Sequence, residues 1–197
     1  MGNTKPYIAV TGLAYRLRPV ELEDAEFIVQ VRLEDAERNR FIHRISPDVE
    51  LQRQWIATQQ QREGDYYFIV ENNLTGEKEG LISIYDTVNN KADWGRWVLR
   101  KGSFAALESV ALVFRVAFEV LGLDEVYSRT IVENVSVVRF HENNGEKRRC
   151  IHKAFFTLEG KPCDAVEHYV DRAYYETELK AILEQKAERI HQRSSQA

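Results

Sequence analysis

The middle of the chain predicts three consecutive strands followed by one long helix, and this run limits the fold more than any other feature. Segments rich in aromatic and β-branched residues, at 66–72, 80–87 and 92–99, are separated by polar turns, which is typical of hairpins. Residues 105–121 then place apolar side chains at helical spacing, and Gly122 follows as a helix-ending residue. This order predicts an α/β fold in which helices flank a largely antiparallel sheet.

The predicted elements on either side extend this pattern. In chain order they are a strand at 13–18, helices at 21–38 and after Asp48, a strand at 125–132, a helix at 135–144, strands near 147–158 and 164–174, and a helix at 176–193. The first helix shows a break near Arg32. We therefore expect one α/β domain with a central mixed, mainly antiparallel sheet over residues 1–174, followed by a C-terminal helix and tail over residues 175–197.

Length, charge and cysteine content exclude several classes of function. The 197 residues suffice for one well-buried core, and a formal net charge of −4 provides no basic field that would attract nucleic acid. No apolar stretch approaches the roughly 18 residues of a membrane-spanning helix, and the N-terminus is too polar for a signal peptide. Cys150 and Cys163 form no C-x-x-C pair, so we expect no metal site. These features predict a reduced, cytoplasmic protein that binds neither nucleic acid nor membrane.

The segment LRKGSFAALES at residues 99–109 carries the first functional signal. An apolar strand ends here, and the cations Arg100 and Lys101 precede Gly102 and the start of the long helix. The amide groups at a helix N-terminus carry a positive partial charge, so a turn of this kind can bind phosphate. The segment matches neither the Walker pattern nor the dinucleotide-binding glycine pattern. The alternative is an ordinary connection that two cations keep soluble.

A second segment, ENVSVVRFHENNG at residues 133–145, follows the next strand and predicts a short helix that ends at glycine. Together with the cationic turn, this order of elements resembles the GCN5-related N-acetyltransferase (GNAT) superfamily. The resemblance covers about residues 13–174 and is closest in character to the branch of ribosomal-protein N-terminal and amino-sugar N-acetyltransferases. The segments that carry it are RLRPVELEDAEFI, YYFIVEN, TGEKEGLISIYD, DWGRWVL, AFEVLGLDEVYSRTIVEN and VVRFHENNG.

The resemblance implies that acetyl-CoA is the co-substrate and lies in a splay between the fourth and fifth strands. The backbone of the fourth strand, which ends in Val98 and Leu99, would pair with the pantetheine arm. The loop that would hold the pyrophosphate is Lys101-Gly102-Ser103-Phe104-Ala105-Ala106. Phe104 stands where the family has a glycine, and a side chain there could crowd the approach of phosphate to the backbone. Asn134 and Arg139 match family positions near the cofactor.

The resemblance also implies the catalytic groups. His141 stands where many family members carry a tyrosine that protonates the departing CoA thiolate, and imidazole, with a pKa of about 6.5, can do the same. The alternative is a histidine that faces solvent. Direct attack by an amine, without a covalent enzyme intermediate, also requires a proton acceptor. The candidates are a chain of water molecules or a carboxylate, and no motif chooses among Asp86, Asp93, Glu133 and Glu167.

The segment RLEDAERNRFIH at residues 32–43 bears on the acceptor, because the resemblance places it beside the acceptor site. It has no strong apolar face towards its end, and its polar residues include Arg32, Arg38, Asn39 and Arg40. Cations at this place suit a phosphorylated or nucleotide-linked acceptor. The alternative is a solvated surface.

Aromatic side chains gather in the central strands, at Tyr66, Tyr67, Tyr85, Trp94 and Trp97. Strict alternation along the strand would place Trp94 with Arg96 on one face and Trp97 on the other. One face has to form core, and the other could form a pocket that stacks a base or a sugar.

These observations predict an acyl-CoA-dependent N-acetyltransferase. Its acceptor is expected to be the primary amine of a small molecule, and a nucleotide-linked amino sugar is the best match. One alternative acceptor is a protein N-terminus. A second alternative is a degenerate CoA-binding module with a regulatory role, for which Phe104 is the main support.

The predicted C-terminal helix carries an apolar stripe that needs a cover. The stripe follows the spacing of Leu179, Ile182, Leu183, Lys186 and Ile190. A helix of this length is marginal on its own in water, so the stripe packs either on its own domain or on a second copy. We favour a homodimer.

Overall fold

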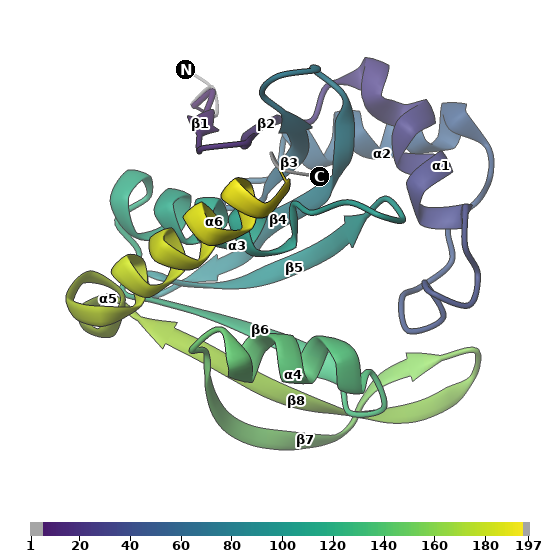
Figure 1. Ribbon diagram of the computed structural model, residues 1–197. Coiled ribbons are helices and arrows are strands. Elements are labelled where there is room, and N and C mark those ends of the chain that lie inside the picture. The colour runs from purple at the N-terminus through teal and green to yellow at the C-terminus, as the bar shows by residue number, and fades with distance from the viewer. Residues whose placement is uncertain (1–5, 195–197) are drawn as a thin grey trace.

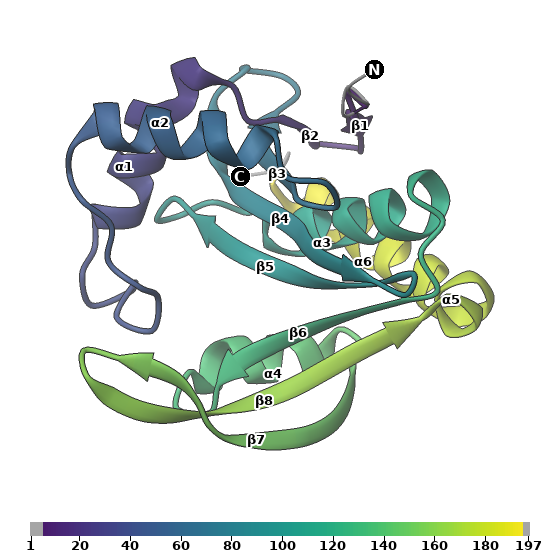
Figure 2. The same cartoon turned by 180° about the vertical axis from the view of Figure 1, so that it is seen from behind.

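The sheet has eight strands in the order β1-β2-β3-β4-β5-β6-β8-β7 and carries helices on both faces (Figures 1 and 2). The structure is a computed structural model that describes residues 6–194, with side chains through residue 192. Neighbouring strands are antiparallel except β5 and β6, which are parallel. The predicted α/β domain with a mixed, mainly antiparallel sheet is therefore confirmed.

The strands lie close to their predicted places, and β1 is an addition to the predicted set. Their bounds are β1 Val10–Thr11, β2 Tyr15–Pro19, β3 Tyr66–Asn72, β4 Lys78–Val88, β5 Lys91–Leu99, β6 Glu125–Ile131, β7 Lys147–Leu158 and β8 Lys161–Asp171. Strands β3, β4 and β5 form the predicted run of hairpins, and β7 and β8 form a long hairpin at the other end of the sheet.

The helices include two π-helical segments that the periodicity does not reveal. Their bounds are η1 Leu22–Asp24, α1 Ala25–Leu33, α2 Val49–Gln60, α3 Ala106–Arg115, η2 Val116–Val120, α4 Val135–Asn143, α5 Arg172–Tyr174, η3 Tyr175–Leu179 and α6 Lys180–Ser194; η2 and η3 are π-helical and η1 is 3₁₀. Among residues 6–194, no helix is both long and apolar enough to cross a membrane.

The helix α1 ends at Leu33, close to the predicted break near Arg32, and does not continue to residue 38. The side chain of Asn39 explains the end, because its Nδ2 donates hydrogen bonds of 3.1 Å to the carbonyl oxygens of both Val31 and Arg32. The chain then crosses from α1 to α2 through a loop, which Figure 1 shows reaching towards the β7–β8 hairpin.

Two cores lie on opposite faces of the sheet. Helices α3, α4 and α6 cover one face, and α1 and α2 cover the other face over β3, β4 and β5 (Figures 1 and 2). The larger core includes Trp94 and Phe114 under α3, and the smaller core includes Ile56 of α2 and Val98 of β5. The strand β5 thus contributes to both cores, which places it rigidly in the middle of the fold.

The C-terminal helix packs on its own domain. Leu179, Leu183 and Ala187 are buried in the larger core, beside α3. The other apolar positions of the predicted stripe, Ile182 and Ile190, remain 40% and 36% exposed. The main part of the stripe is therefore covered without a second copy, and the homodimer stays a prediction.

Candidate functional site

The strands β5 and β6 pair only over their first residues and then separate. Their parallel register runs from Lys91 opposite Glu125 to Asp93 opposite Tyr127. Beyond this point β5 keeps β4 as its partner on one side, and its other edge is unpaired. An unpaired strand edge offers backbone donors and acceptors to an extended, peptide-like ligand. This is the splay that the resemblance implies, and Val98 and Leu99 lie on the free part of β5.

A β-bulge in β5 shapes the opening. Leu81 lies opposite Val98 and Ser83 opposite Gly95, so two residues of β5 face one residue of β4. Arg96 takes a φ of 47°, in the left-handed region that residues with a side chain rarely adopt.

The bulge overturns the predicted alternation of β5. The rings of Trp94 and Trp97 lie 6.0 Å apart and pack against the same core. The guanidinium of Arg96 lies instead 4.3 Å from the ring centre of Tyr85, on the opposite face. The prediction that Trp94 shares a face with Arg96 is therefore wrong, because the extra residue of the bulge shifts Trp97 to the other side of the strand.

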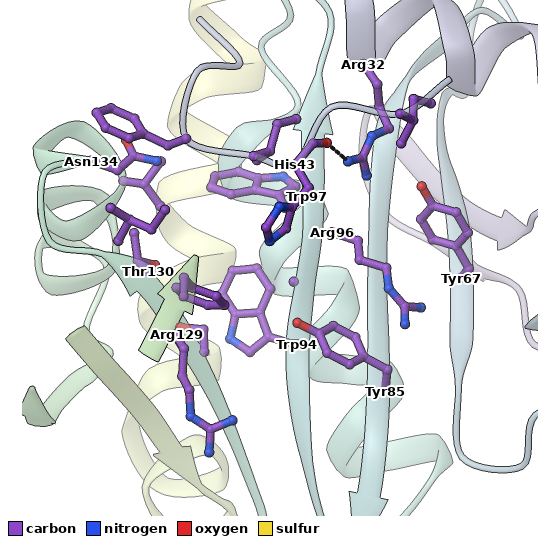
Figure 3. Close-up of a pocket in the computed structure, with 18 of the residues that line it drawn as sticks. Arg32, His43, Tyr67, Tyr85, Trp94, Arg96, Trp97, Arg129, Thr130 and Asn134 are labelled. Atoms are coloured by element: carbon purple, nitrogen blue, oxygen red, sulfur yellow. Dashed lines mark hydrogen bonds between the residues drawn. The ribbon is translucent and has the colours of Figure 1, made fainter. Parts of the chain in front are cut away.

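A cavity of about 530 Å³ lies in the opening and reaches α1, α2 and the loop between them (Figure 3). Its aromatic lining consists of Phe41, Trp55, Tyr67, Tyr85, Trp94, Trp97 and Phe156. Its basic lining consists of Arg32, His43, Arg96, Arg129 and His141. Among the residues that the structure describes, no aspartate or glutamate lines the cavity. Arg96 is paired with Asp65, and Arg129 with Asp93 and Glu167, so Arg32 is the lining guanidinium that has no ion pair among the described residues. The cavity therefore suits a ligand that packs on aromatic faces and places a negative charge near Arg32.

His141 is buried on α4 and lines the cavity, so the alternative of a solvent-facing histidine is wrong. Its Nδ1 lies 2.6 Å from Glu146 Oε1, and its Nε2 lies 3.3 Å from Thr130 Oγ1. Trp94 Nε1 donates to the other oxygen of Glu146 at 3.3 Å. Because an ionised carboxylate only accepts, Nδ1 carries the hydrogen, and Nε2 is the atom that can exchange a proton with a ligand. The contact with Glu146 also fixes the orientation of the imidazole ring.

A second histidine lies against His141. His168 of β8 is fully buried, and the two rings stack with centres 5.0 Å apart. Burial, and then the neighbouring charge of His141, hold the pKa of His168 below its ordinary value. Both effects favour the neutral form of His168.

Among the four carboxylate candidates for the proton acceptor, Asp93 has the most suitable surroundings. Burial raises the pKa of Asp93 to about 7, although the charge of Arg129, which donates to Asp93 Oδ2 at 3.0 Å, and the Tyr85 side chain oppose the rise. Asp86 and Glu133 are exposed.

Glu167 is already occupied by three basic groups. Burial raises its pKa, but hydrogen bonds with His152 and Arg149 and the charge of Arg129 outweigh this effect, so the pKa lies below its usual range. A proton acceptor at neutral pH needs a pKa near that pH, which favours Asp93. Asp93 does not line the cavity itself, but Tyr85 and Arg129, which both interact with it, do.

Gly95 leaves room for the hydroxyl of Tyr85. A Cβ at position 95 would lie 2.9 Å from that hydroxyl, closer than normal packing allows. Burial, and then the charge of Asp93, raise the pKa of Tyr85, so the phenol keeps its proton. Neither this glycine nor Glu146 was expected at the site. A signal for each exists, since Gly95 interrupts a strand and Glu146 follows His141 by five residues, across the end of α4.

The loop after β5 places the predicted phosphate-binding residues at the start of α3. Gly102 has a φ of 83°, and a Cβ there would meet nothing within 4 Å. Ser103 Oγ accepts from the amide of Ala105 at 3.2 Å, and no side chain caps the first turn of α3. Phe104 is 65% exposed, so its ring lies mostly in solvent and not against the turn.

The predicted residues of α4 do not all reach the cavity. Asn134 precedes the helix and lines the cavity together with His141. Arg139 is exposed on the same helix and is not among the lining residues. The structure thus brings Asn134, His141 and the free edge of β5 to one opening.

A separate cluster of possible metal ligands lies on β7 and β8. Cys150 Sγ lies 3.4 Å from His152 Nε2, and the same nitrogen lies 2.8 Å from Glu167 Oε2. Arg149 and Arg129 also bind Glu167, at 3.0 and 3.1 Å, and their charges oppose a metal cation. The absence of a functional metal stays a prediction. Both cysteines are free.

The parted parallel strands, the unpaired edge and the aromatic cavity define a domain that binds an extended ligand beside a buried acid–base group. The chain belongs to the GNAT acetyltransferase family: the profile of the family described as Acetyltransferase (GNAT) domain matches residues 15–147. It is an acyl-CoA-dependent N-acetyltransferase, and its co-substrate is acetyl-CoA.

Solved structures agree with this assignment. A structure described as FdhC, a nucleotide-linked sugar GNAT in its apo form, is 27% identical over 83% of this chain and 89% of its own, with a TM-score of 0.69. An acetyltransferase of T. thermophilus, known from its structure, is 26% identical over 92% of this chain and 97% of its own, with a TM-score of 0.76. A GCN5-related N-acetyltransferase from Brucella melitensis is 17% identical, covers 91% of this chain and 86% of its own with a TM-score of 0.78, and supports the fold alone. A search of curated protein sequences returns no significant match.

Proposed function

We propose that this enzyme transfers the acetyl group of acetyl-CoA to the primary amine of a nucleotide-linked amino sugar. The observation that carries the proposal is the lining of the cavity, which combines aromatic rings with arginines and lacks carboxylates among the described residues. A polyamine acceptor carries several positive charges and would meet no carboxylate among the described lining residues. A nucleotide-linked sugar offers a sugar ring that packs on aromatic side chains and phosphates that bind arginine. The likeness to a nucleotide-linked sugar GNAT supports the same choice.

The residues around the splay fit acetyl-CoA. The pantetheine arm would pair with the free edge of β5 near Val98 and Leu99. The pyrophosphate would bind in the loop of residues 101–106 at the start of α3, which has no side-chain cap. It would replace Glu34 and Ser103, which now accept from the amides of Lys101 and Ala105. The exposed ring of Phe104 leaves those amides accessible, so we propose that the loop binds phosphate although it lacks the family's glycine.

The reaction needs two proton transfers. The neutral amine attacks the thioester carbonyl, a C–N bond forms, and the C–S bond breaks to leave an acetamide and a thiolate. His141 Nε2 donates its proton to the thiolate sulfur, while Glu146 holds Nδ1 and orients the ring. The proton that the amine loses passes through the Tyr85 hydroxyl to Asp93, whose pKa of about 7 allows it to accept near neutral pH. The products are the N-acetylated sugar and CoA with a free thiol.

A panel of acceptors tests the proposal. Acetyl-CoA is first expected to raise the melting temperature, because a ligand that binds the native state stabilises it. Release of the CoA thiol is then measured with dTDP-linked and UDP-linked amino sugars, spermidine, and a peptide with a free N-terminus. We expect the highest kcat/KM for a nucleotide-linked sugar. A higher value for the peptide or for spermidine would contradict the proposed acceptor, and no thermal shift with acetyl-CoA would favour the degenerate module.

A further inference from the structure

A second cavity, of about 230 Å³, lies between the α1–α2 loop and the tip of the β7–β8 hairpin. It shares Arg32, Ile42 and His43 with the larger cavity, so the two cavities are neighbours across these side chains. Figure 1 shows the loop and the hairpin facing each other on the open side of the splay, where a ligand of the larger cavity would project.

The charges around the second cavity are unbalanced. Its lining includes Arg32, Arg40, Arg44 and His43, against the single carboxylate of Glu159. Arg40 is paired with Glu37 at 2.6 Å. Arg32 and Arg44 form no ion pair with any carboxylate that the structure describes. Unpaired guanidinium groups on a concave surface attract and bind anions.

The fold holds Arg32 in place without neutralising it. Its Nη2 donates to the carbonyl oxygen of His43 at 2.6 Å, a contact visible in Figure 3. Its Nε is buried and has no hydrogen-bond partner. Tyr67 is its neighbour, and the charge of Arg32 is among the effects that oppose the rise of the Tyr67 pKa on burial. A buried donor without a partner is costly, and an anionic ligand that accepts a hydrogen bond from Arg32 would remove this cost.

We propose that the second cavity is the subsite for the phosphate groups of the acceptor, with Arg32 binding them at the junction of the two cavities and Arg44 at the outer side. The inference rests on the proposed function, and it adds an orientation. The amino sugar occupies the larger cavity near Tyr85 and His141, and the phosphates lie towards the α1–α2 loop. Guanidinium groups suit this role because their planar set of donors matches phosphate oxygens.

Binding measurements test the subsite without turnover. Calorimetric titration with dTDP, UDP and inorganic pyrophosphate is carried out with CoA at saturation, so that the cofactor's own phosphate sites are filled. We expect the Kd for dTDP to rise by about tenfold or more in Arg32→Ala, less in Arg32→Lys, and by about threefold to tenfold in Arg44→Ala. Circular dichroism checks that Arg32→Ala is folded, and Arg44→Ala tests the same subsite through an exposed residue.

Arg38→Ala is the matched control, because Arg38 is exposed on the same loop and lines neither cavity. Its Kd for dTDP is expected to equal that of the wild type. Loss of dTDP binding when CoA is saturating would show that the phosphates compete with the cofactor and would overturn the proposal. Equal weakening in Arg38→Ala and Arg44→Ala would also overturn it, since it would indicate a diffuse field and not a site.

Steady-state kinetics separate this inference from the proposed function. The wild type and Arg44→Ala are compared with a nucleotide-linked amino sugar and with the same sugar lacking the nucleotide. We expect Arg44→Ala to raise KM for the nucleotide-linked sugar and to leave KM for the free sugar unchanged. Turnover of nucleotide-linked sugars that is indifferent to Arg32 and Arg44 would overturn the subsite while the function stands. Binding of dTDP that depends on Arg32, in an enzyme that acetylates no nucleotide-linked sugar, would overturn the function while the subsite stands.

Discussion

The two walls of the larger cavity differ in how completely the nitrogen atoms of one basic side chain in each, His141 and Arg32, are satisfied. The α4 wall, formed by Ser128, Thr130, Asn134, Val137 and His141, holds a buried imidazole with a partner at each nitrogen. The loop wall, formed by Arg32, Phe41, Ile42, His43 and Trp55, holds an arginine whose Nε has no partner. A group that the fold already satisfies is oriented before the substrate arrives, which is what proton transfer requires. A group left unsatisfied gains most from a ligand, which is what binding requires.

The largest expected effect comes from removing the proposed acid, His141, from the α4 wall. His141→Ala should lower kcat by about 10²-fold, near the lower end for general acid catalysis, because a thiolate is already a fair leaving group. The KM for acetyl-CoA should change little. His141→Tyr should retain more activity than His141→Ala, since a phenol also donates a proton. Thiol release measured at saturating substrates checks the order, and an alanine variant as fast as the wild type would show that His141 is not the acid.

Asp93→Asn should lower kcat by about 10- to 10²-fold at pH 8, because the amine loses its proton acceptor. The pKa of Asp93 is about 7, so its carboxylate fraction and the wild-type rate should rise as pH rises through 7. This rise of kcat with pH should disappear in Asp93→Asn. Asp86→Asn, at an exposed position, is the control. If kcat of Asp93→Asn still rises with pH through 7, the ionisation of the amine or of another base causes the rise.

The same substitution has a stability readout. The folded-state pKa of Asp93 is raised above the unfolded value, so its contribution to stability is fully present below about pH 4 and is lost as pH rises through 7. The free energy of unfolding of Asp93→Asn should therefore fall less than that of the wild type when pH is raised from 5 to 8. Urea unfolding at pH 5 and pH 8 measures the difference.

Glu146→Gln tests whether the carboxylate that contacts His141 Nδ1 assists proton donation by His141. The amide can still accept from His141 Nδ1 but does not stabilise the imidazolium, so we expect kcat to fall by about tenfold. Acceptor KM should stay near the wild-type value, because Glu146 does not line the cavity. A loss confined to KM would mean that Glu146 shapes the pocket and does not assist the acid.

The smallest expected effect concerns Phe104. Since its ring is 65% exposed, Phe104→Gly should leave the affinity for acetyl-CoA within about tenfold, or 1.4 kcal/mol. Titration of acetyl-CoA by thermal shift or calorimetry checks this. A much larger gain in affinity would mean that the ring occludes the phosphate loop of the wild type.

The order of elements and the family positions could be read from the chain because they depend on local signals. Periodicity marks the long helix after β5, glycine marks its end, and Asn134 and His141 stand at fixed places in the motif at the end of the next strand. The choice of Asp93 among four carboxylates could not be read in this way. No sequence signal ranks the four. In the structure Asp86 and Glu133 are exposed, and the buried Glu167 is held ionised by His152, Arg149 and Arg129, whereas burial raises the pKa of Asp93.

The sequence by itself determined which residues form strands and helices, and where a cationic turn meets a helix N-terminus, because backbone preference and apolar spacing act over a few neighbouring residues. Only the tertiary structure decided which side chains share a cavity. The bulge at Arg96 moves Trp97 to the face of Trp94, Glu146 reaches back to His141, and the α1–α2 loop brings Arg32 beside a hairpin that lies far along the chain. Such contacts depend on register and packing between distant segments, and no local pattern records them.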